Sequence, residues 1–436
     1  MSGHASACDV CVIGAGLAGL SAAALLRARG VDVRVIERAS RPGGRAAVSR
    51  RDGYTLDFGI HSLRFGHRSP AARVLRSLGE QLELCPQRDS ESYVIAGGKM
   101  IRRFDDPQAF LATPELTVGQ KLAVAAMVSK LILWHPASAY ATSLAEAVGP
   151  LARDPAVKEV MRFIGFAIMA PDPERASAGE VSDFLRAQAL TRVRVADPRG
   201  GMGQIVDKLV RKLGPGRLRL ENPMRRMAFS GRRVDRLECD QGTQCCRAVL
   251  YAAPLQQLFD VADPAFFPAG LVHACRALEP TSGLTLDFGL KRPVSDLSGS
   301  LIDLDRGAMG KFPSNTDPGL APAGKQLASW LVMLEPGACA SKERIEEAER
   351  ALRALIERFC PELFAQVEWE RRLVHPIMDG VHLRVGQAFP DRQPVRCPQL
   401  DNLFFAGDTV RARGCSGDIA FQSAMEAAEA ILGFLR

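Results

Sequence analysis

The sequence has 436 residues, of which 47% are hydrophobic and 24% are charged. At about 150 residues per domain this length predicts two or three domains, and the composition excludes a disordered or fibrous protein. Lysine and arginine outnumber aspartate and glutamate by 56 to 49, which gives a net charge of +7. Because the basic residues are scattered, we expect no nucleic-acid partner. The excess is compatible with weak attraction to an anionic membrane surface.

The eleven cysteines are irregularly spaced, so we expect no disulfide framework and a reducing, cytoplasmic compartment. Cys8 and Cys11 have the spacing of a metal-binding pair but lack a second pair, and we expect no metal site. The residues before Cys8 do not form the apolar segment of a signal peptide. No uncharged apolar run reaches about 18 residues, so no transmembrane helix is predicted.

The strongest signal is a glycine-rich turn near the start of the chain. Residues 9–13 are apolar and rich in β-branched side chains, which is typical of a buried parallel strand. Gly14, Gly16 and Gly19 follow, and residues 20–30 have the alanine and leucine content of a helix. A second strand is predicted over 31–36 and is followed by Glu37. This order predicts an α/β fold of the Rossmann type.

Each residue of this motif has a physical role. Gly14 permits a tight turn, Gly16 lets the backbone approach a pyrophosphate, and Gly19 lets the helix pack closely on the strand. The start of the helix offers unpaired N–H groups to phosphates. Glu37, about 20 residues later, accepts hydrogen bonds from ribose hydroxyls and repels the 2′-phosphate of NADP. We therefore predict a dinucleotide site.

Further motifs extend this site. Pro-Gly-Gly-Arg at residues 42–45 provides a second close backbone approach and a guanidinium for the pyrophosphate. Residues 57–61 read Asp-Phe-Gly-Ile-His. Near the other end of the chain, an apolar strand over 402–406 leads to Gly407 and Asp408. A helix is predicted over about 419–435, and its first N–H groups are suited to a site where negative charge develops.

Together these motifs resemble the FAD-dependent amine oxidase superfamily, and the pattern is closest to its phytoene desaturase-like and protoporphyrinogen oxidase-like members. The resemblance implies FAD, held by a Rossmann-type (GR2) FAD-binding domain that is interleaved with an α+β substrate domain. The FAD contacts that it implies are Gly14, Ala15, Gly16, Leu17, Ala18, Glu37, Arg38, Gly44, Arg45, Gly59, Ile60, His61, Met224, Gly407, Asp408, Asp418 and Ile419. Of these, Gly59, Ile60 and His61 would lie near the isoalloxazine ring, and Met224 would meet the adenine.

The same resemblance divides the chain into two discontinuous domains. We expect residues 1–64, 196–274 and 396–436 to form the FAD-binding domain. Residues 65–195 and 275–395 would form the substrate domain.

Two departures from the resembling family argue against amine oxidation. Cys415 and Ser416 stand where amine oxidases carry part of an aromatic cage, and the chain has only four tyrosines and three tryptophans. The strand predicted over 283–288 lacks the lysine that amine oxidases place near the flavin. We therefore favour an apolar substrate, with His61 as the candidate base or orienting group. His375 and His382 are interpreted as structural.

An apolar helix is predicted over residues 120–134, with Lys121 and Lys130 near its ends. It is either a core helix of the substrate domain, which we favour by a small margin, or an element that dips into a membrane. Residues 163–169 either line an apolar tunnel or belong to the core.

The preferred hypothesis is an FAD-dependent desaturase, dehydrogenase or oxidase that acts on a lipophilic isoprenoid, polyene or tetrapyrrole-like substrate. Hydride would pass to flavin N5. One alternative is an FAD-dependent amine or small-metabolite oxidase. An alternative of another class is a protein that binds isoprenoids without redox chemistry, like the escort proteins of prenylated GTPases.

Overall fold

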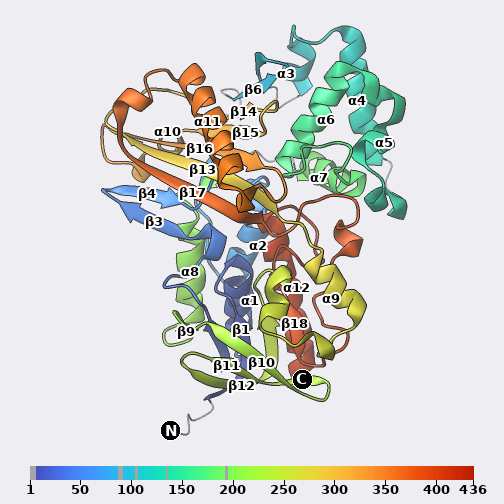
Figure 1. Cartoon of the computed structure of the whole chain (residues 1–436), viewed down its shortest axis with the longest axis vertical. Coiled ribbons are helices and arrows are strands. Elements are labelled where there is room, and N and C mark those ends of the chain that lie inside the picture. Colours follow the sequence, from blue (N-terminus) through green and yellow to red (C-terminus); the bar gives the residue numbers. More distant parts are fainter. Residues whose placement is uncertain (1–5, 87–91, 104–106, 134–135, 192–194) are drawn as a thin grey trace.

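The computed structural model describes residues 6–86, 92–103, 107–133, 136–191 and 195–436. Figure 1 shows an elongated molecule in which one sheet lies in the lower part and a second sheet lies in the upper part. A group of helices stands beside the second sheet.

In the described part of the chain, the lower sheet has seven strands, six of them in the order β10-β11-β12-β1-β2-β9, with β18 beside β12. The central strand β1 runs parallel to β12 and β2, and β18 runs parallel to β12. The strands are β1 (Ser6–Ile13), β2 (Val33–Ile36), β9 (Leu218–Arg219), β10 (Met224–Ser230), β11 (Arg233–Cys239), β12 (Gly242–Tyr251) and β18 (Leu403–Phe405).

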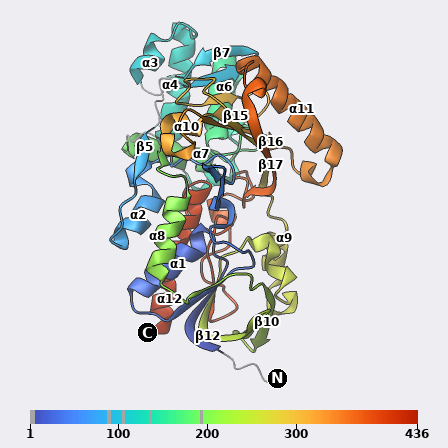
Figure 2. The ribbon, with the colours of Figure 1, turned by 90° about the vertical axis from the view of Figure 1, so that its left-hand side faces the viewer.

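Helices cover both faces of this sheet because its central strand is apolar on both sides. Val10 and Val12 pack against one layer, whereas Cys11 and Ile13 pack against the other. Figure 2 shows α1, α8 and α12 on one side of the sheet and α9 on the other. These helices are α1 (Leu17–Ala28), α8 (Gly203–Leu213), α9 (Ala269–Arg276) and α12 (Gly417–Leu435). The α/β fold of the Rossmann type is therefore confirmed.

The upper sheet has the order β17-β13-β16-β15-β14-β6-β7 among the described residues. All of its neighbouring strands are antiparallel except β14 and β6. The strands are β6 (Tyr93–Ala96), β7 (Lys99–Arg102), β13 (Thr281–Leu290), β14 (Leu301–Asp303), β15 (Ala308–Lys311), β16 (Gln326–Leu334) and β17 (Val367–Asp379).

The central strand β13 has two different faces because its side chains alternate. Leu284, Leu286 and Phe288 belong to an apolar cluster that includes residues of α11 (Lys342–Phe359). Thr285 and Asp287 alternate with them, so they lie on the opposite face, and both are buried. That polar face is turned toward a short hairpin formed by β3 (Val48–Arg51) and β4 (Tyr54–Asp57). Arg371 links the two, because it binds Asp287 and also donates to Ser49 Oγ of the hairpin at 2.9 Å.

Helices beside the upper sheet enclose a separate apolar cluster. They are α3 (Pro107–Ala112), α4 (Val118–Leu133), α5 (Leu144–Val148), α6 (Pro155–Ala167) and α7 (Ala178–Thr191), and α2 (Pro70–Ser77) packs against α12 below. The helix predicted over 120–134 is α4, although Trp134 lies outside the described residues.

The strands of the lower sheet all come from residues 1–64, 196–274 and 396–436, and those of the upper sheet from residues 65–195 and 275–395. One small sheet joins the two sets, because β5 (Leu84–Pro86) pairs with β8 (Ala196–Pro198). The division into two domains at these boundaries stays a prediction.

Candidate functional site

The turn between β1 and α1 allows a ligand to approach the backbone closely. Gly14 has a φ of +102°, and a Cβ atom at Gly19 would lie 2.0 Å from the carbonyl oxygen of Gly14. Only glycine fits either position without a shift of the backbone. Gly16 is the N-cap of α1 and brings no capping side chain. The first N–H groups of α1 therefore lack partners within the helix and form a site suited to phosphate.

The carboxylate of Glu37 lies directly beside this turn. Its Oε2 accepts the N–H of Ala15 at 2.7 Å, and its Oε1 accepts the N–H of Ala39 at 2.8 Å. Each carboxylate oxygen has a second lone pair, so Glu37 is held in place and can still accept ribose hydroxyls. Met224 opens β10, and the nearby Asn222 donates its N–H to the carbonyl of Glu37 at 2.9 Å. The segment expected to meet the adenine thus lies beside the acid expected to meet the ribose.

A second glycine turn packs against the first. Gly43 donates its N–H to the carbonyl of Ala15 at 2.8 Å, and a Cβ atom at Gly44 would lie 3.3 Å from the Cα atom of Gly16. Arg45 follows and donates two hydrogen bonds of 2.7 Å to the carboxylate of Asp408. The N–H of Gly380 also donates to Asp408, at 2.7 Å.

Asp408 is thereby held as an anion. Burial alone would raise the pKa of Asp408, but Arg45 and the N–H of Gly380 outweigh it and lower that pKa. Arg45 and Asp408 are both predicted FAD contacts, and the structure shows that their side chains also bind each other. Arg38, another expected contact, has an exposed side chain.

Helix α12 begins near this ion pair. Ser416 has a φ of +52° and donates to Asp379 Oδ2 at 3.1 Å. Asp418 is buried, and its Oδ2 atom has no hydrogen-bond partner in the described part of the chain. Burial, partly offset by Arg64, raises the pKa of Asp418 to about 6. An unpaired buried carboxyl oxygen next to a helix N-terminus is a position that a polar ligand group would satisfy.

The loop after β4 carries the predicted isoalloxazine contacts. Gly59 has a φ of +106°, and a Cβ atom there would lie 3.9 Å from His375 Nε2. His375 Nε2 lies 3.1 Å from the Oγ1 atom of Thr285. Burial, reinforced by the charges of His61 and Arg371, lowers the pKa of His375 to about 4. The structure thus brings a neutral imidazole to the loop that holds His61.

From the sequence, His375 is predicted to be structural, and Thr285 has no predicted role. Polar and apolar residues alternate in part of residues 281–290, and this pattern places Thr285 on the polar face of a strand expected near the flavin. That alternation is the signal from which Thr285 could have been predicted as a site residue. Cys415 is buried, and burial raises its thiol pKa to about 12, which does not favour a reactive thiolate.

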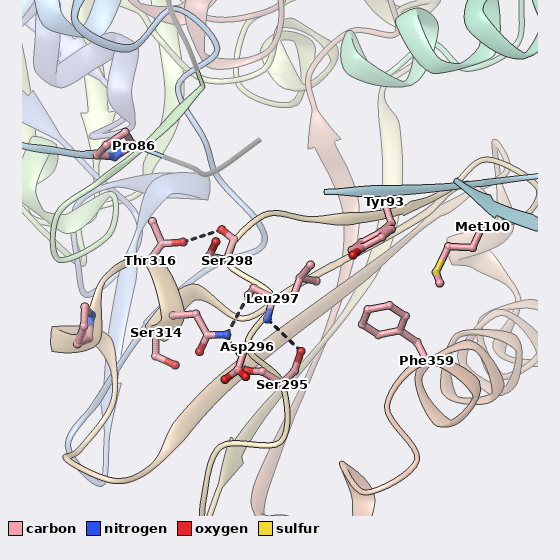
Figure 3. Close-up of a pocket in the computed structure, with 12 residues that line it drawn as sticks. Pro86, Tyr93, Met100, Ser295, Asp296, Leu297, Ser298, Ser314, Thr316 and Phe359 are labelled. Atoms are coloured by element: carbon pink, nitrogen blue, oxygen red, sulfur yellow. Dashed lines mark hydrogen bonds between the residues drawn. The ribbon is translucent and has the colours of Figure 1, made fainter. Parts of the chain in front are cut away.

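A large cavity lies elsewhere in the molecule and belongs to none of these groups. Its volume is about 1090 Å³. Figure 3 shows Tyr93, Met100 and Phe359 on one side of it and Ser295, Ser298 and Thr316 on the other. No predicted site residue lines it.

Comparisons with known proteins agree with these features. The profile of the family described as flavin containing amine oxidoreductase matches residues 17–432, and the chain belongs to this family. A phytoene dehydrogenase of Streptomyces griseus is 26% identical over 89% of this chain and 87% of its own length. A coproporphyrinogen III oxidase of Staphylococcus aureus is 31% identical, over 21% of this chain and 20% of that protein.

Solved structures share the fold. An oxidoreductase from Methanosarcina mazei superposes with a TM-score of 0.80 at 19% identity, over 97% of this chain and 100% of that one. A putrescine oxidase bound to putrescine gives a TM-score of 0.74 at 17% identity, over 98% of this chain and 100% of that one.

Membership of this family establishes that the protein is an enzyme, a flavoprotein oxidoreductase whose cofactor is FAD. The residues fit this group, because two glycine turns form a cradle, Glu37 stands beside it, and Asp418 has an unpaired oxygen. The assignment of individual residues to parts of FAD stays a prediction.

Proposed function

We propose that this FAD-dependent oxidoreductase is a desaturase, dehydrogenase or oxidase of a lipophilic isoprenoid, polyene or tetrapyrrole-like substrate. The observation that carries the proposal is one continuous apolar cluster. It contains Val124, Met127 and Leu131 of α4 and extends to Cys415 and Ile419 at the start of α12. Packed apolar side chains therefore connect a surface helix with the residues expected beside the flavin.

The groups near that end lack the features of an amine-binding site. Burial raises the pKa of Asp379, reinforced by Asp408, and burial also raises the pKa of Asp418 to about 6. Asp379 is moreover engaged by Ser416 and lies 3.5 Å from Thr281 Oγ1. Asp379 therefore already has hydroxyl partners, and the small residues Cys415 and Ser416 stand here where amine oxidases carry part of an aromatic cage.

When bound, FAD supplies the acceptor for a hydrogen and its bonding electron pair. The residues of this chain would hold the reacting carbon in place and exclude water. His61 and His375 lie near one another at the expected ring position, and the neutral imidazole of His375 can hydrogen-bond or accept a proton there. We propose His61 as the group that takes the proton lost by the substrate.

An experiment with three substrates distinguishes this proposal from the amine oxidase alternative. The FAD-loaded protein is mixed anaerobically with phytoene in detergent, with protoporphyrinogen, or with putrescine, and the visible absorbance of the flavin is followed. We expect phytoene or protoporphyrinogen to bleach the flavin and putrescine to leave it oxidised. Bleaching by putrescine alone would favour amine oxidation.

We also infer that the enzyme is a cytoplasmic protein that touches a membrane through α3 and α4. The side chains of Leu111, Leu122 and Leu133 are 66%, 66% and 80% exposed, although other residues of α4 are buried. Lys121 donates to the carbonyl of Leu111 at 2.6 Å, which places the end of α3 beside the start of α4. Exposed leucines together with Lys121 and Lys130, and no acidic residue in α4, suit an anionic lipid surface.

This mode of contact is peripheral, since no helix among the described residues is long and apolar enough to cross a bilayer. All eleven cysteines are free, which supports a reducing compartment. The test is sedimentation with anionic liposomes of a variant carrying Leu122→Ser and Leu133→Ser. We expect it to lose binding at unchanged melting temperature, whereas Phe266→Ser, at an exposed site in the lower part, retains binding. Equal binding by all three proteins would contradict the contact.

A further inference from the structure

A buried ion pair lies behind the loop that carries the predicted isoalloxazine contacts. Lys311, the last residue of β15, donates to Asp197 Oδ2 at 2.7 Å, and the two side chains are 6% and 11% exposed. Ser62, which directly follows His61, donates to Asp197 Oδ1 at 2.7 Å. Because removing two charges from water costs free energy, a buried pair of this kind is weak evidence for a purely stabilising role.

Lys311 stands at the end of a polar row that crosses the upper sheet. Arg371, Asp287, Ser329 and Lys311 are directly paired residues of the neighbouring strands β17, β13, β16 and β15. Arg371 and Ser329 both donate to Asp287, at 2.7 Å each. The carboxylate of Asp287 therefore already has hydrogen-bond donors, and Lys311 binds Asp197 beside the loop instead.

The ion pair and the loop both line a small cavity. Its volume is about 30 Å³, and a buried water needs about 10–15 Å³, so at least one water fits. The walls are polar on several sides, which is the condition for a water to be held. The lining residues that matter here are Asp57, Gly59, His61, Asp197 and Lys311.

Two carboxyl groups, those of Asp57 and Asp197, and one lysine, Lys311, line this cavity. Burial raises the pKa of Asp57, Asp197 raises it further, and His61 and Lys311 act against the rise. The N–H of Met202 also donates to Asp57 Oδ1 at 3.0 Å. The charged or titratable groups that act on the Asp57 carboxyl are His61, Asp197 and Lys311, and Arg371 donates to the Asp57 carbonyl. Asp57 is thus a carboxyl whose charge state depends on its neighbours.

We propose that water in this cavity links His61 to Asp57, and that the Lys311–Asp197 pair sets the charge of Asp57 so that Asp57 receives the proton released during substrate oxidation. This inference rests on the proposed function. When one hydrogen leaves the substrate with its electron pair for the FAD, a second hydrogen leaves the adjacent atom as a proton. The electrons of that second bond form the new double bond, and His61 passes the proton through water to the Asp57 carboxylate. Lys311 and Asp197 are positioning residues in this route.

Infrared titration of the resting FAD-loaded protein tests the proposal without substrate. The stretching band of a protonated carboxyl that is lost in Asp57→Asn reports the protonation of Asp57. Lys311→Met removes a cation and should move this titration to higher pH, whereas Asp197→Asn removes an anion and should move it to lower pH, each by about one unit. A purely structural role would lower the melting temperature of both variants without these opposite shifts.

Two further variants serve as controls. Lys311→Arg keeps the charge and should retain the wild-type titration, and it remains informative if Lys311→Met does not fold. Lys325→Met breaks a more exposed pair, also at 2.7 Å, between the residue before β16 and Glu368 of β17, and it should leave the titration unchanged. The acid limb of flavin reduction by phytoene should move with the infrared titration.

Absent shifts, or shifts in the same direction for Lys311→Met and Asp197→Asn, would overturn the proposal. Because the titration needs no substrate, that result would leave the proposed substrate class standing. Conversely, failure of every lipophilic substrate to reduce the flavin would count against the proposed function while opposite shifts were still observed.

Discussion

Arg45 and Asp408 are 363 positions apart in the sequence, and their side chains form a two-bond ion pair with both distances at 2.7 Å. Arg45 follows the second glycine turn, and Asp408 follows β18 in the last part of the chain. The pair therefore joins the two ends of the chain at the candidate cofactor site.

This pair gives the first prediction. Asp408→Asn should destabilise the fold by about 1–3 kcal/mol, because it leaves a charged guanidinium without its partner and Arg45 is partly solvated. The lowered pKa of Asp408 adds stability above the ordinary carboxyl pKa of 3.8, which is lost as pH falls through the lowered value. Thermal unfolding between pH 3 and 7 measures this, and a variant that matches the wild type at pH 7 would contradict it.

Glu37 should bind FAD and not only order the turn. Glu37→Ala is expected to weaken FAD binding by about 2–4 kcal/mol, since it removes hydrogen bonds to a charged acceptor. The variant also loses the acceptors of the Ala15 and Ala39 N–H groups. Glu37→Gln, which keeps one oxygen, serves as the control and should lose less. Full retention of FAD by Glu37→Ala through desalting and dilution would show that the ribose assignment is wrong.

The last segment should be indispensable for the fold. Deleting the chain from Asn402 onward removes β18, Asp408 and α12, and α12 packs against α1 beside the glycine turn. Ser423 of α12 also bonds the N–H and carbonyl groups of Gly407, at 2.9 and 3.1 Å. We expect an insoluble or unfolded product that does not retain FAD. A truncated protein that is folded and yellow would refute the discontinuous FAD-binding domain.

His375 should remain uncharged at neutral pH. Its pKa is lowered to about 4 from 6.5, so the unfolded chain takes up a proton before the folded one does. Stability should therefore fall as pH drops from 6.5 to 4, and His375→Gln should lack this part of the pH dependence. Proton NMR of the ring should show no titration between pH 6 and 8. A ring signal that titrates there would place His375 in a different environment.

The sequence could predict the part of the site that is local in the chain. Two short turns of the backbone contain the spaced glycines, Glu37 and the segment around Arg45. The roles of these residues follow from φ angles and hydrogen-bonding geometry. The partners Thr285 and His375 could not be identified in this way. They meet only because of the register between β13 and β17, and register depends on packing between distant segments.

The contacts of Lys311 and the exposure of α4 also depend on packing between distant segments and could not be predicted from the sequence. Lys311 reaches Asp197 through the pairing of β15 with β16 and of β8 with β5. The apolar pattern of α4 left a core helix and a membrane element both open. The structure shows that one face is buried and another is exposed, a division that a nearly uniform apolar sequence does not encode.

The most direct test of the central claim is a single-turnover experiment with a lipophilic substrate. The FAD-loaded protein is mixed anaerobically with phytoene in excess, the fraction of flavin reduced is read from its absorbance, and the polyene is then analysed by mass spectrometry. We expect one product molecule with two hydrogens fewer for each flavin reduced. Unchanged phytoene with fully oxidised flavin, under conditions in which putrescine reduces the same protein, would contradict the proposed function.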